Sequence, residues 1–105
     1  MIHELRTYRI TDGKMPNILS RFEDITFGIF NRHGIKVTAF WTKKDVNELI
    51  YLCEFENEAA MTSAWDAFRV DPDWVAAKAE TEAAGPIVSE VISEVLIPTS
   101  FSPIQ

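Results

Sequence analysis

Apolar residues recur along this chain with two different periods, one typical of strands and one typical of helices. Runs rich in β-favouring residues, each ended by turn-forming residues, predict four strands. These predicted strands cover residues 2–10, 35–43, 48–56 and 86–97. Between the first two runs, apolar residues recur at steps of three and four from Met15 to Phe30, which predicts a helix from near Pro16 to His33.

A second helical region follows the third strand. Asn57 is suited to cap a helix whose apolar stripe ends at Phe68, and Asp71 followed by Pro72 predicts a new helix start. The resulting order, strand–helix–strand–strand–helix pair–strand, is the βαββαβ arrangement of ferredoxin-like α+β domains. We therefore expect a single domain over residues 1–105, with a four-stranded antiparallel sheet that carries its helices on one face.

The other face of such a sheet would expose large apolar side chains. Tyr8, Trp41, Tyr51 and Ile92 all lie in predicted strands, and isolated monomers rarely expose a broad apolar surface. Packing of two sheets face to face covers this surface in the simplest way. The sequence therefore predicts a homodimer.

Charge and cysteine content narrow the set of partners and compartments. Ten basic residues against 16 acidic ones give a net charge of −6, which disfavours nucleic acid. No segment resembles a signal peptide or a membrane span, so we expect no membrane insertion. Cys53 is the only cysteine and has no partner for a disulfide, which favours a cytoplasmic location.

Three polar residues of the first strand are the main candidates for ligand binding. Glu4, Arg6 and Tyr8 share one face because strand side chains alternate, while His3 and Leu5 share the other. Leu5 is the better match for packing under a helix, so we expect the polar trio to face the barrel interior, away from the helices. The alternative is that Glu4 and Arg6 form only a structural ion pair.

Trp41 and His33 complete the set of candidate residues. Trp41 lies on the second strand, where it could line the same cavity, and His33 is the candidate catalytic histidine. A structural alternative for His33 is a cap at the end of the first helix. Two isolated histidines predict no metal site, and the chain has no glycine-rich phosphate loop or activated nucleophile. We expect no cofactor, and Cys53 to be buried rather than reactive.

Several strings resemble those of the NIPSNAP family and occur in the same order along the chain. They are ELRTYRI, RHG, FWT, NELIYL, WDAFRVDPDW and PTSFSPI. The chain departs from many relatives at Tyr51 and Cys53, where histidine and tryptophan are common, so no family role is carried over to these positions. The resemblance implies the dimeric α/β-barrel fold, in which two ferredoxin-like sheets face each other.

The resemblance and the residues together leave three hypotheses for function. The first is a homodimeric barrel that binds a small molecule in its interior. The second is a non-catalytic interaction module, because the family is associated with vesicle traffic and mitochondria. The third is a cofactor-free monooxygenase or isomerase, because the wider fold group contains such enzymes. Whether the protein is an enzyme stays open at this point, since fold alone does not choose among these functions.

Overall fold

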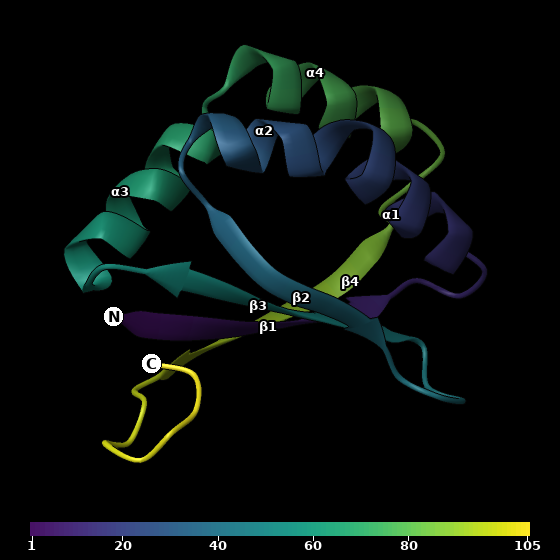
Figure 1. Ribbon diagram of the computed structural model, residues 1–105. Coiled ribbons are helices and arrows are strands. Elements are labelled where there is room, and N and C mark those ends of the chain that lie inside the picture. The colour runs from purple at the N-terminus through teal and green to yellow at the C-terminus, as the bar shows by residue number, and fades with distance from the viewer.

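The computed structural model describes residues 1–105 and shows all helices packed on one face of a four-stranded sheet (Figure 1). The predicted βαββαβ order is confirmed. The elements are β1 (Ile2–Ile10), α1 (Met15–Arg21), η1 (Phe22–Thr26), α2 (Phe27–Arg32), β2 (Lys36–Thr42), β3 (Glu48–Phe55), α3 (Glu58–Arg69), α4 (Pro72–Thr81) and β4 (Val88–Leu96).

The sheet is antiparallel, with strand order β2-β3-β1-β4, so β1 is central and bonds both β3 and β4. The predicted hairpin between β2 and β3 is present. One irregularity interrupts it, because the register shifts by one residue between Val37 and Ala39. Such a bulge reverses the alternation of side chains in β2, so that Val37 and Phe40 face the same side of the sheet.

The helix predicted from Pro16 to His33 is continuous in space but changes its winding at the centre. Residues Phe22–Thr26, labelled η1, form a π-helical segment, in which the Phe27 N–H donates to the carbonyl of Phe22, five residues earlier. Ile18, Phe22 and Phe30 lie buried on the side of this helix that faces the sheet. The regular period of apolar residues gave no sign of the wider central turn.

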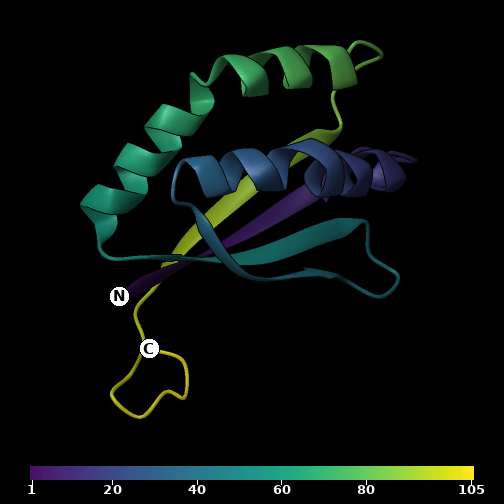
Figure 2. The same cartoon turned by 45° about the horizontal axis from the view of Figure 1, so that its top comes forward.

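Both predicted helix caps at the start of α3 and α4 are confirmed. Asn57 Oδ1 accepts a hydrogen bond from the Ala60 N–H at 2.8 Å, and Asp71 Oδ1 accepts one from the Asp73 N–H at 2.9 Å. These bonds satisfy amides that a helix leaves unpaired in its first turn. Figure 2 shows how the break at Asp71 lets α3 and α4 form an arch beside the first helix.

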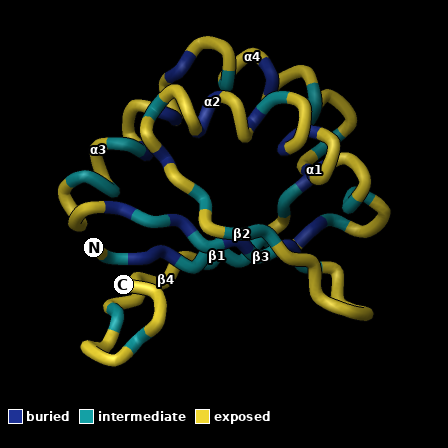
Figure 3. Tube along the Cα trace, viewed as in Figure 1, coloured by how far each residue is buried: buried dark blue, intermediate teal, exposed yellow.

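The core lies between the sheet and the helices, where the buried positions of the tube in Figure 3 are concentrated. In β3, burial alternates, and the residues that face the helices are Leu49, Tyr51, Cys53 and Phe55. Phe30 joins these residues to α3, because its ring centroid lies 5.3 Å from that of Trp65. Burial of Cys53 agrees with the expectation of an unreactive thiol, and it raises the pKa of that thiol to about 12.

The opposite face of the sheet carries no helix, and the C-terminal loop lies on that side (Figures 1 and 2). Nε2 of His3 lies 3.1 Å from the carbonyl oxygen of Gln105, so the loop covers one end of this open face. The sequence placed His3 under the first helix, and that assignment is wrong. No helix has the length and apolar character needed to cross a bilayer.

The Asp71 carboxylate has two roles that substitutions can separate. Besides capping α4, it binds Arg32 at 3.0 Å and His33 Nε2 at 2.6 Å. The hydrogen bond from His33, together with the Asp73 amide and Arg32, holds the pKa of Asp71 below its usual value although burial opposes this. We expect Asp71→Ala to lower the denaturation midpoint more than Asp71→Asn, because asparagine can still cap the helix.

The pH dependence of these variants provides a further check. A folded-state pKa below the unfolded value means that the carboxylate stabilises the fold at neutral pH and loses this effect as the pH falls through the folded value. The midpoints of wild type and Asp71→Asn should therefore converge in acid. Equal midpoints for all three proteins in urea at neutral pH would contradict both roles of Asp71.

Candidate functional site

The polar trio of β1 lies under the helices, not on the open face where the sequence analysis placed it. The indole Nε1 of Trp65 in α3 donates to Glu4 Oε1 at 2.7 Å, and the ring of Tyr8 lies 6.0 Å from that of Phe22. Leu5 occupies the open face instead. Alternation correctly groups Glu4, Arg6 and Tyr8, but polarity does not identify their side, because α3 supplies a buried polar partner.

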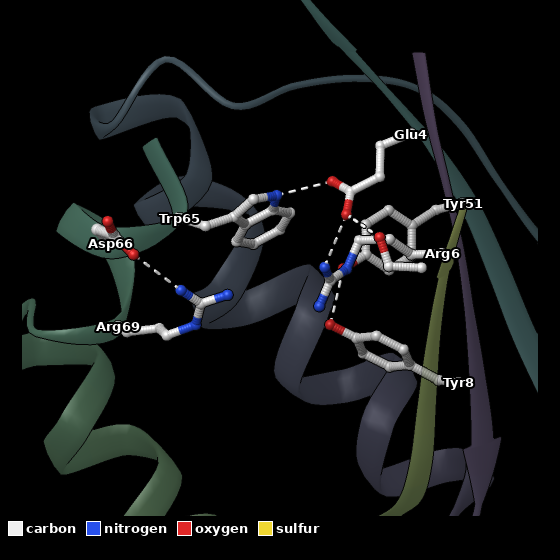
Figure 4. Close-up of polar contacts among 8 residues, drawn as sticks. Glu4, Arg6, Tyr8, Tyr51, Trp65, Asp66 and Arg69 are labelled. Atoms are coloured by element: carbon white, nitrogen blue, oxygen red, sulfur yellow. Dashed lines mark hydrogen bonds and ion pairs between the residues drawn. The ribbon is translucent and has the colours of Figure 1, made fainter. Parts of the chain in front are cut away.

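Glu4 is 2% exposed, and its carboxylate accepts hydrogen bonds from three elements (Figure 4). Trp65 in α3 binds one oxygen, while Arg6 Nη1, at 3.0 Å, and the Ser93 hydroxyl of β4 bind the other. A buried carboxylate requires such partners, because removal from water disfavours its charge. The predicted Glu4–Arg6 ion pair is therefore present and fully supported by hydrogen bonds.

Arg6 is held from several sides by polar and aromatic groups. Its Nε donates to the Tyr51 hydroxyl at 2.9 Å, and its guanidinium carbon lies 4.2 Å above the centroid of the Trp65 ring. Burial tends to lower the pKa of Arg6, but the oxygens of Tyr51, Tyr8 and Glu4 outweigh burial and raise it. Arg6 is consequently a permanent cation in the interior of the fold.

Tyr51 is a site residue that the sequence analysis missed. Its side chain is fully buried in β3, and its hydroxyl lies 2.7 Å from that of Tyr8. Burial raises the pKa of Tyr51 well above its ordinary value, so the phenol keeps its proton. The pairing of Tyr51 with Arg6 across the two strands could have indicated this contact, but only once the strand register was known.

Beside this polar cluster, a cavity of about 320 Å³ lies between the sheet and the helices. Its volume falls at the lower end of the range typical of sites for small molecules. Aromatic rings from β1, η1, α3 and α4 contribute to its wall, whereas β4 contributes none. The lining residues are Arg6, Tyr8, Arg21, Phe22, Thr26, Trp65, Phe68, Arg69, Trp74, Lys78, Glu82, Val88, Ser89, Glu90 and Val91.

The cavity is basic although the chain as a whole is acidic. Four of the ten basic residues line it, namely Arg6, Arg21, Arg69 and Lys78, against only two carboxylates. Ion pairs join most of these charges, because Arg21 binds Glu82 at 3.1 Å, Arg69 binds Asp66 at 3.1 Å and Arg6 binds Glu4 at 3.0 Å. Lys78 has no acidic partner, and the lining groups themselves carry two more positive than negative charges. Such a wall favours an anionic guest.

Two of the lining residues each have a buried polar atom without a hydrogen-bond partner. These atoms are Nε of Arg21 and the hydroxyl oxygen of Thr26, in residues that are only 6% and 2% exposed. Residues five apart point in different directions on an α-helix. The π-helical turn between them brings both to the same cavity, and such turns occur frequently at functional sites.

Two other predicted site residues lie elsewhere. Trp41 pairs with Ile50 and is 49% exposed on the open face, because the bulge in β2 places Phe40 under the helices instead. His33 follows α2 and binds the carboxylate of Asp71, away from the residues that line the cavity. The predicted convergence of Trp41 and His33 with Arg6 and Tyr8 is therefore wrong.

The site has donors for anions rather than a cluster of metal ligands. No three His, Cys, Asp or Glu side chains in the chain gather closely enough to hold a metal ion. The groups that line the cavity are guanidinium, ammonium, hydroxyl and indole groups and phenyl rings, together with the carboxylates of Glu82 and Glu90. This combination can hold a negatively charged group at one end and a flat apolar body along the aromatic wall.

Comparison with known proteins supports the family resemblance seen in the sequence. The model of the NIPSNAP family matches residues 3–103. An uncharacterised NIPSNAP domain protein from Burkholderia xenovorans shares 27% identity at a TM-score of 0.84, with 98% of this chain and 99% of that chain covered. No curated protein matches the chain in sequence.

More distant structures share the fold alone. Protein Atu4242 from Agrobacterium tumefaciens is 21% identical, with a TM-score of 0.88 and complete coverage of both chains. SnoaB from Streptomyces nogalater, a cofactor-independent oxygenase, is 12% identical, with a TM-score of 0.66 over 97% of this chain and 96% of that chain. Together, these structures confirm the ferredoxin-like α+β fold, a four-stranded antiparallel sheet with helices on one face.

The buried ion pair predicts that two glutamate substitutions differ in their effect on the free energy of unfolding. We expect Glu4→Gln to lower the free energy of unfolding by about 3 kcal/mol, because it leaves the Arg6 cation buried without its counterion. Glu90→Gln is the matched control, since its ion pair with Arg9 is exposed and should contribute little. Equal losses for the two variants in urea denaturation would show that the Glu4–Arg6 pair has no special importance.

Proposed function

The chain belongs to the NIPSNAP family, and we propose that it binds a small organic anion with an aromatic body in the cavity between its sheet and its helices. The observation that carries the proposal is a cavity of about 320 Å³ whose lining combines four basic side chains with five aromatic rings. Guanidinium and ammonium groups bind anions, and aromatic rings bind a flat apolar body. One ligand that carries both features would match this lining.

The shape and lining of the cavity support an aromatic body for this ligand. Rings of Phe22, Phe68 and Trp74 line it, and the last two lie 4.7 Å apart between their centroids. The guanidinium of Arg21 lies 5.0 Å from the centroid of Trp74, so charge and aromatic surface are adjacent. A flat anion such as naphthoate matches both features. A cavity of this kind favours ligand binding over a purely structural interaction module.

The open face of the sheet supports a second part of the proposal, a homodimer. Half-buried Leu5, Ile50, Leu52 and Ile92 lie on this face, together with the exposed Trp41. No element of the chain covers the centre of this surface (Figure 1). A second copy offers the same apolar surface in return, which is the requirement of a two-fold symmetric interface.

The C-terminal loop adds apolar surface on the same side. Phe101 is 85% exposed and Ile97 79% exposed, although hydrogen bonds within the loop, such as that from Gln105 Nε2 to the Ser102 carbonyl at 2.6 Å, give it a defined shape. Large exposed apolar side chains on an ordered loop are typical of contact surfaces. We propose that this loop contacts the second copy.

The ligand proposal predicts a preference for charge that depends on the basic wall. Naphthoate should bind more tightly than naphthamide, its neutral counterpart, in titration calorimetry. Arg21→Gln should weaken naphthoate about tenfold or more, the scale of a lost hydrogen bond to a charged group, and Lys78→Gln about two- to fivefold. Lys36→Gln, on the edge strand β2, changes the net charge equally and should have no effect. Equal affinity for the acid and the amide would contradict the proposal.

The dimer proposal predicts a particle of twice the chain mass at micromolar concentration. Light scattering should show this mass for wild type, and Leu52→Lys should reduce it to that of one chain because it buries a charge in the interface. Val75→Lys is the control, since Val75 is exposed on α4, far from the open face. A monomeric wild-type protein with a cooperative fold would show that the open face needs no partner.

A further inference from the structure

The direction of the hydrogen bonds at the centre of the site can be deduced from the donors and acceptors present. Arg6 Nε can only donate, so the Tyr51 oxygen accepts its bond at 2.9 Å. Tyr51 has no exposed surface, and its own proton therefore needs a protein acceptor. The Tyr8 oxygen, 2.7 Å away, is the acceptor within reach. Tyr51 thus donates to Tyr8.

This direction leaves the Tyr8 proton unused by the chain. Besides Tyr51, the Tyr8 hydroxyl has only the Arg6 guanidinium close to it, which can donate but not accept, and Tyr8 lines the cavity. In the series Arg6 to Tyr51 to Tyr8, each bond polarises the next hydroxyl, which makes the last one a stronger donor. Tyr8 therefore offers a strong donor at the cavity wall, supported by a buried cation.

The chemistry of this donor indicates which anion fits. A carboxylate is held best by the two-pronged fork of an arginine, but Arg6 already uses Nε for Tyr51 and Nη1 for Glu4. The single hydroxyl of Tyr8 donates one hydrogen bond, which suits a ligand whose charge lies on one oxygen atom. The ring of Phe22 lies 6.0 Å from that of Tyr8, so a ligand oxygen at Tyr8 would be carried on a flat group that contacts aromatic surface.

We infer that Tyr8 donates its proton in a hydrogen bond to a phenolate-type oxygen of an aromatic ligand, and that Tyr51 is a positioning residue that orients and polarises Tyr8. The inference rests on the proposed function, because it concerns the same cavity. It narrows the ligand class from aromatic anions in general to those that carry a phenolate-type oxygen. It also assigns a role to Tyr51, which does not itself line the cavity.

The test uses para-nitrophenol, whose phenolate form has its own absorption band. Its ionisation in the cavity should shift to lower pH than in water, because the Tyr8 hydroxyl and the basic wall stabilise the phenolate. In Tyr8→Phe, the Kd of the phenolate should rise about tenfold or more, and the pH of ionisation should move back by about one unit or more. Tyr51→Phe should show a smaller change in the same direction, since it removes polarisation and leaves the donor.

Two controls separate this effect from damage to the fold. Para-nitrotoluene has a similar shape without the oxygen, so its affinity should stay constant in both tyrosine variants. Ser89→Ala removes another hydroxyl of the cavity wall, but one whose proton already binds the Arg9 carbonyl at 3.0 Å. We therefore expect Ser89→Ala to bind para-nitrophenolate with wild-type affinity and the wild-type pH of ionisation.

The possible outcomes distinguish this inference from the proposed function. Phenolate binding and ionisation that are the same in Tyr8→Phe and wild type would overturn the role of Tyr8, while binding of naphthoate by the same proteins would leave the proposed function intact. Wild-type protein that binds neither para-nitrophenolate nor naphthoate would overturn both. A loss in Tyr8→Phe that para-nitrotoluene shares equally would assign Tyr8 to shape rather than to hydrogen bonding, and would also overturn the inference.

Discussion

The buried ion pair between Glu4 and Arg6 is the constraint around which the site is organised. A carboxylate and a guanidinium removed from water stabilise a fold only when further hydrogen bonds satisfy their remaining donors and acceptors. Trp65, Ser93 and Tyr51 provide these bonds from α3, β4 and β3. The pair therefore connects the central strand to both neighbouring strands and to the helix layer. Its requirements explain why the centre of an otherwise aromatic core is polar.

The basic cavity follows from the same arrangement. Aromatic residues form a continuous cluster on one side of the ion pair, where Phe30 contacts Trp65 and Phe68 at centroid distances of 5.3 and 5.0 Å. On the other side, toward β4, the helices contribute long basic side chains and a cavity remains. The π-helical turn Phe22–Thr26 follows Arg21 directly, and both Arg21 and Thr26 line this cavity. A net charge of −6 for the whole chain thus conceals a local basic site.

Much of the fold could be predicted from local patterns in the sequence. Strand alternation, the helical period and the capping residues Asn57 and Asp71 gave the order of elements, because each depends on neighbouring residues only. The placement of the site residues, in contrast, depends on partners that are distant in the sequence. Whether Arg6 faces the helices is decided by the indole of Trp65, 59 positions away along the chain, and alternation alone does not contain this information. The candidates Glu4, Arg6 and Tyr8 were thus grouped correctly and assigned to the wrong face.

Two single-residue irregularities shape the site without a signal in the sequence. The bulge after Val37 reverses the parity of β2, so Phe40 lies under the helices, while Trp41 keeps its expected place on the open face. The π-helical turn adds a residue to one helical turn and brings Thr26 into the cavity wall. Neither feature has a clear sequence signature, because both arise where packing of the whole domain outweighs local preference.

We propose a ligand site under the helices rather than between two sheets, and the three tryptophans can test this placement directly. Trp65 and Trp74 line the cavity, whereas Trp41 lies on the open face. A ¹H–¹⁵N NMR titration with naphthoate, in which single Trp→Phe variants assign each indole signal, observes both places at once. We expect the Trp65 and Trp74 indole signals to shift and the Trp41 signal to stay unchanged. A shift of Trp41 alone would contradict it.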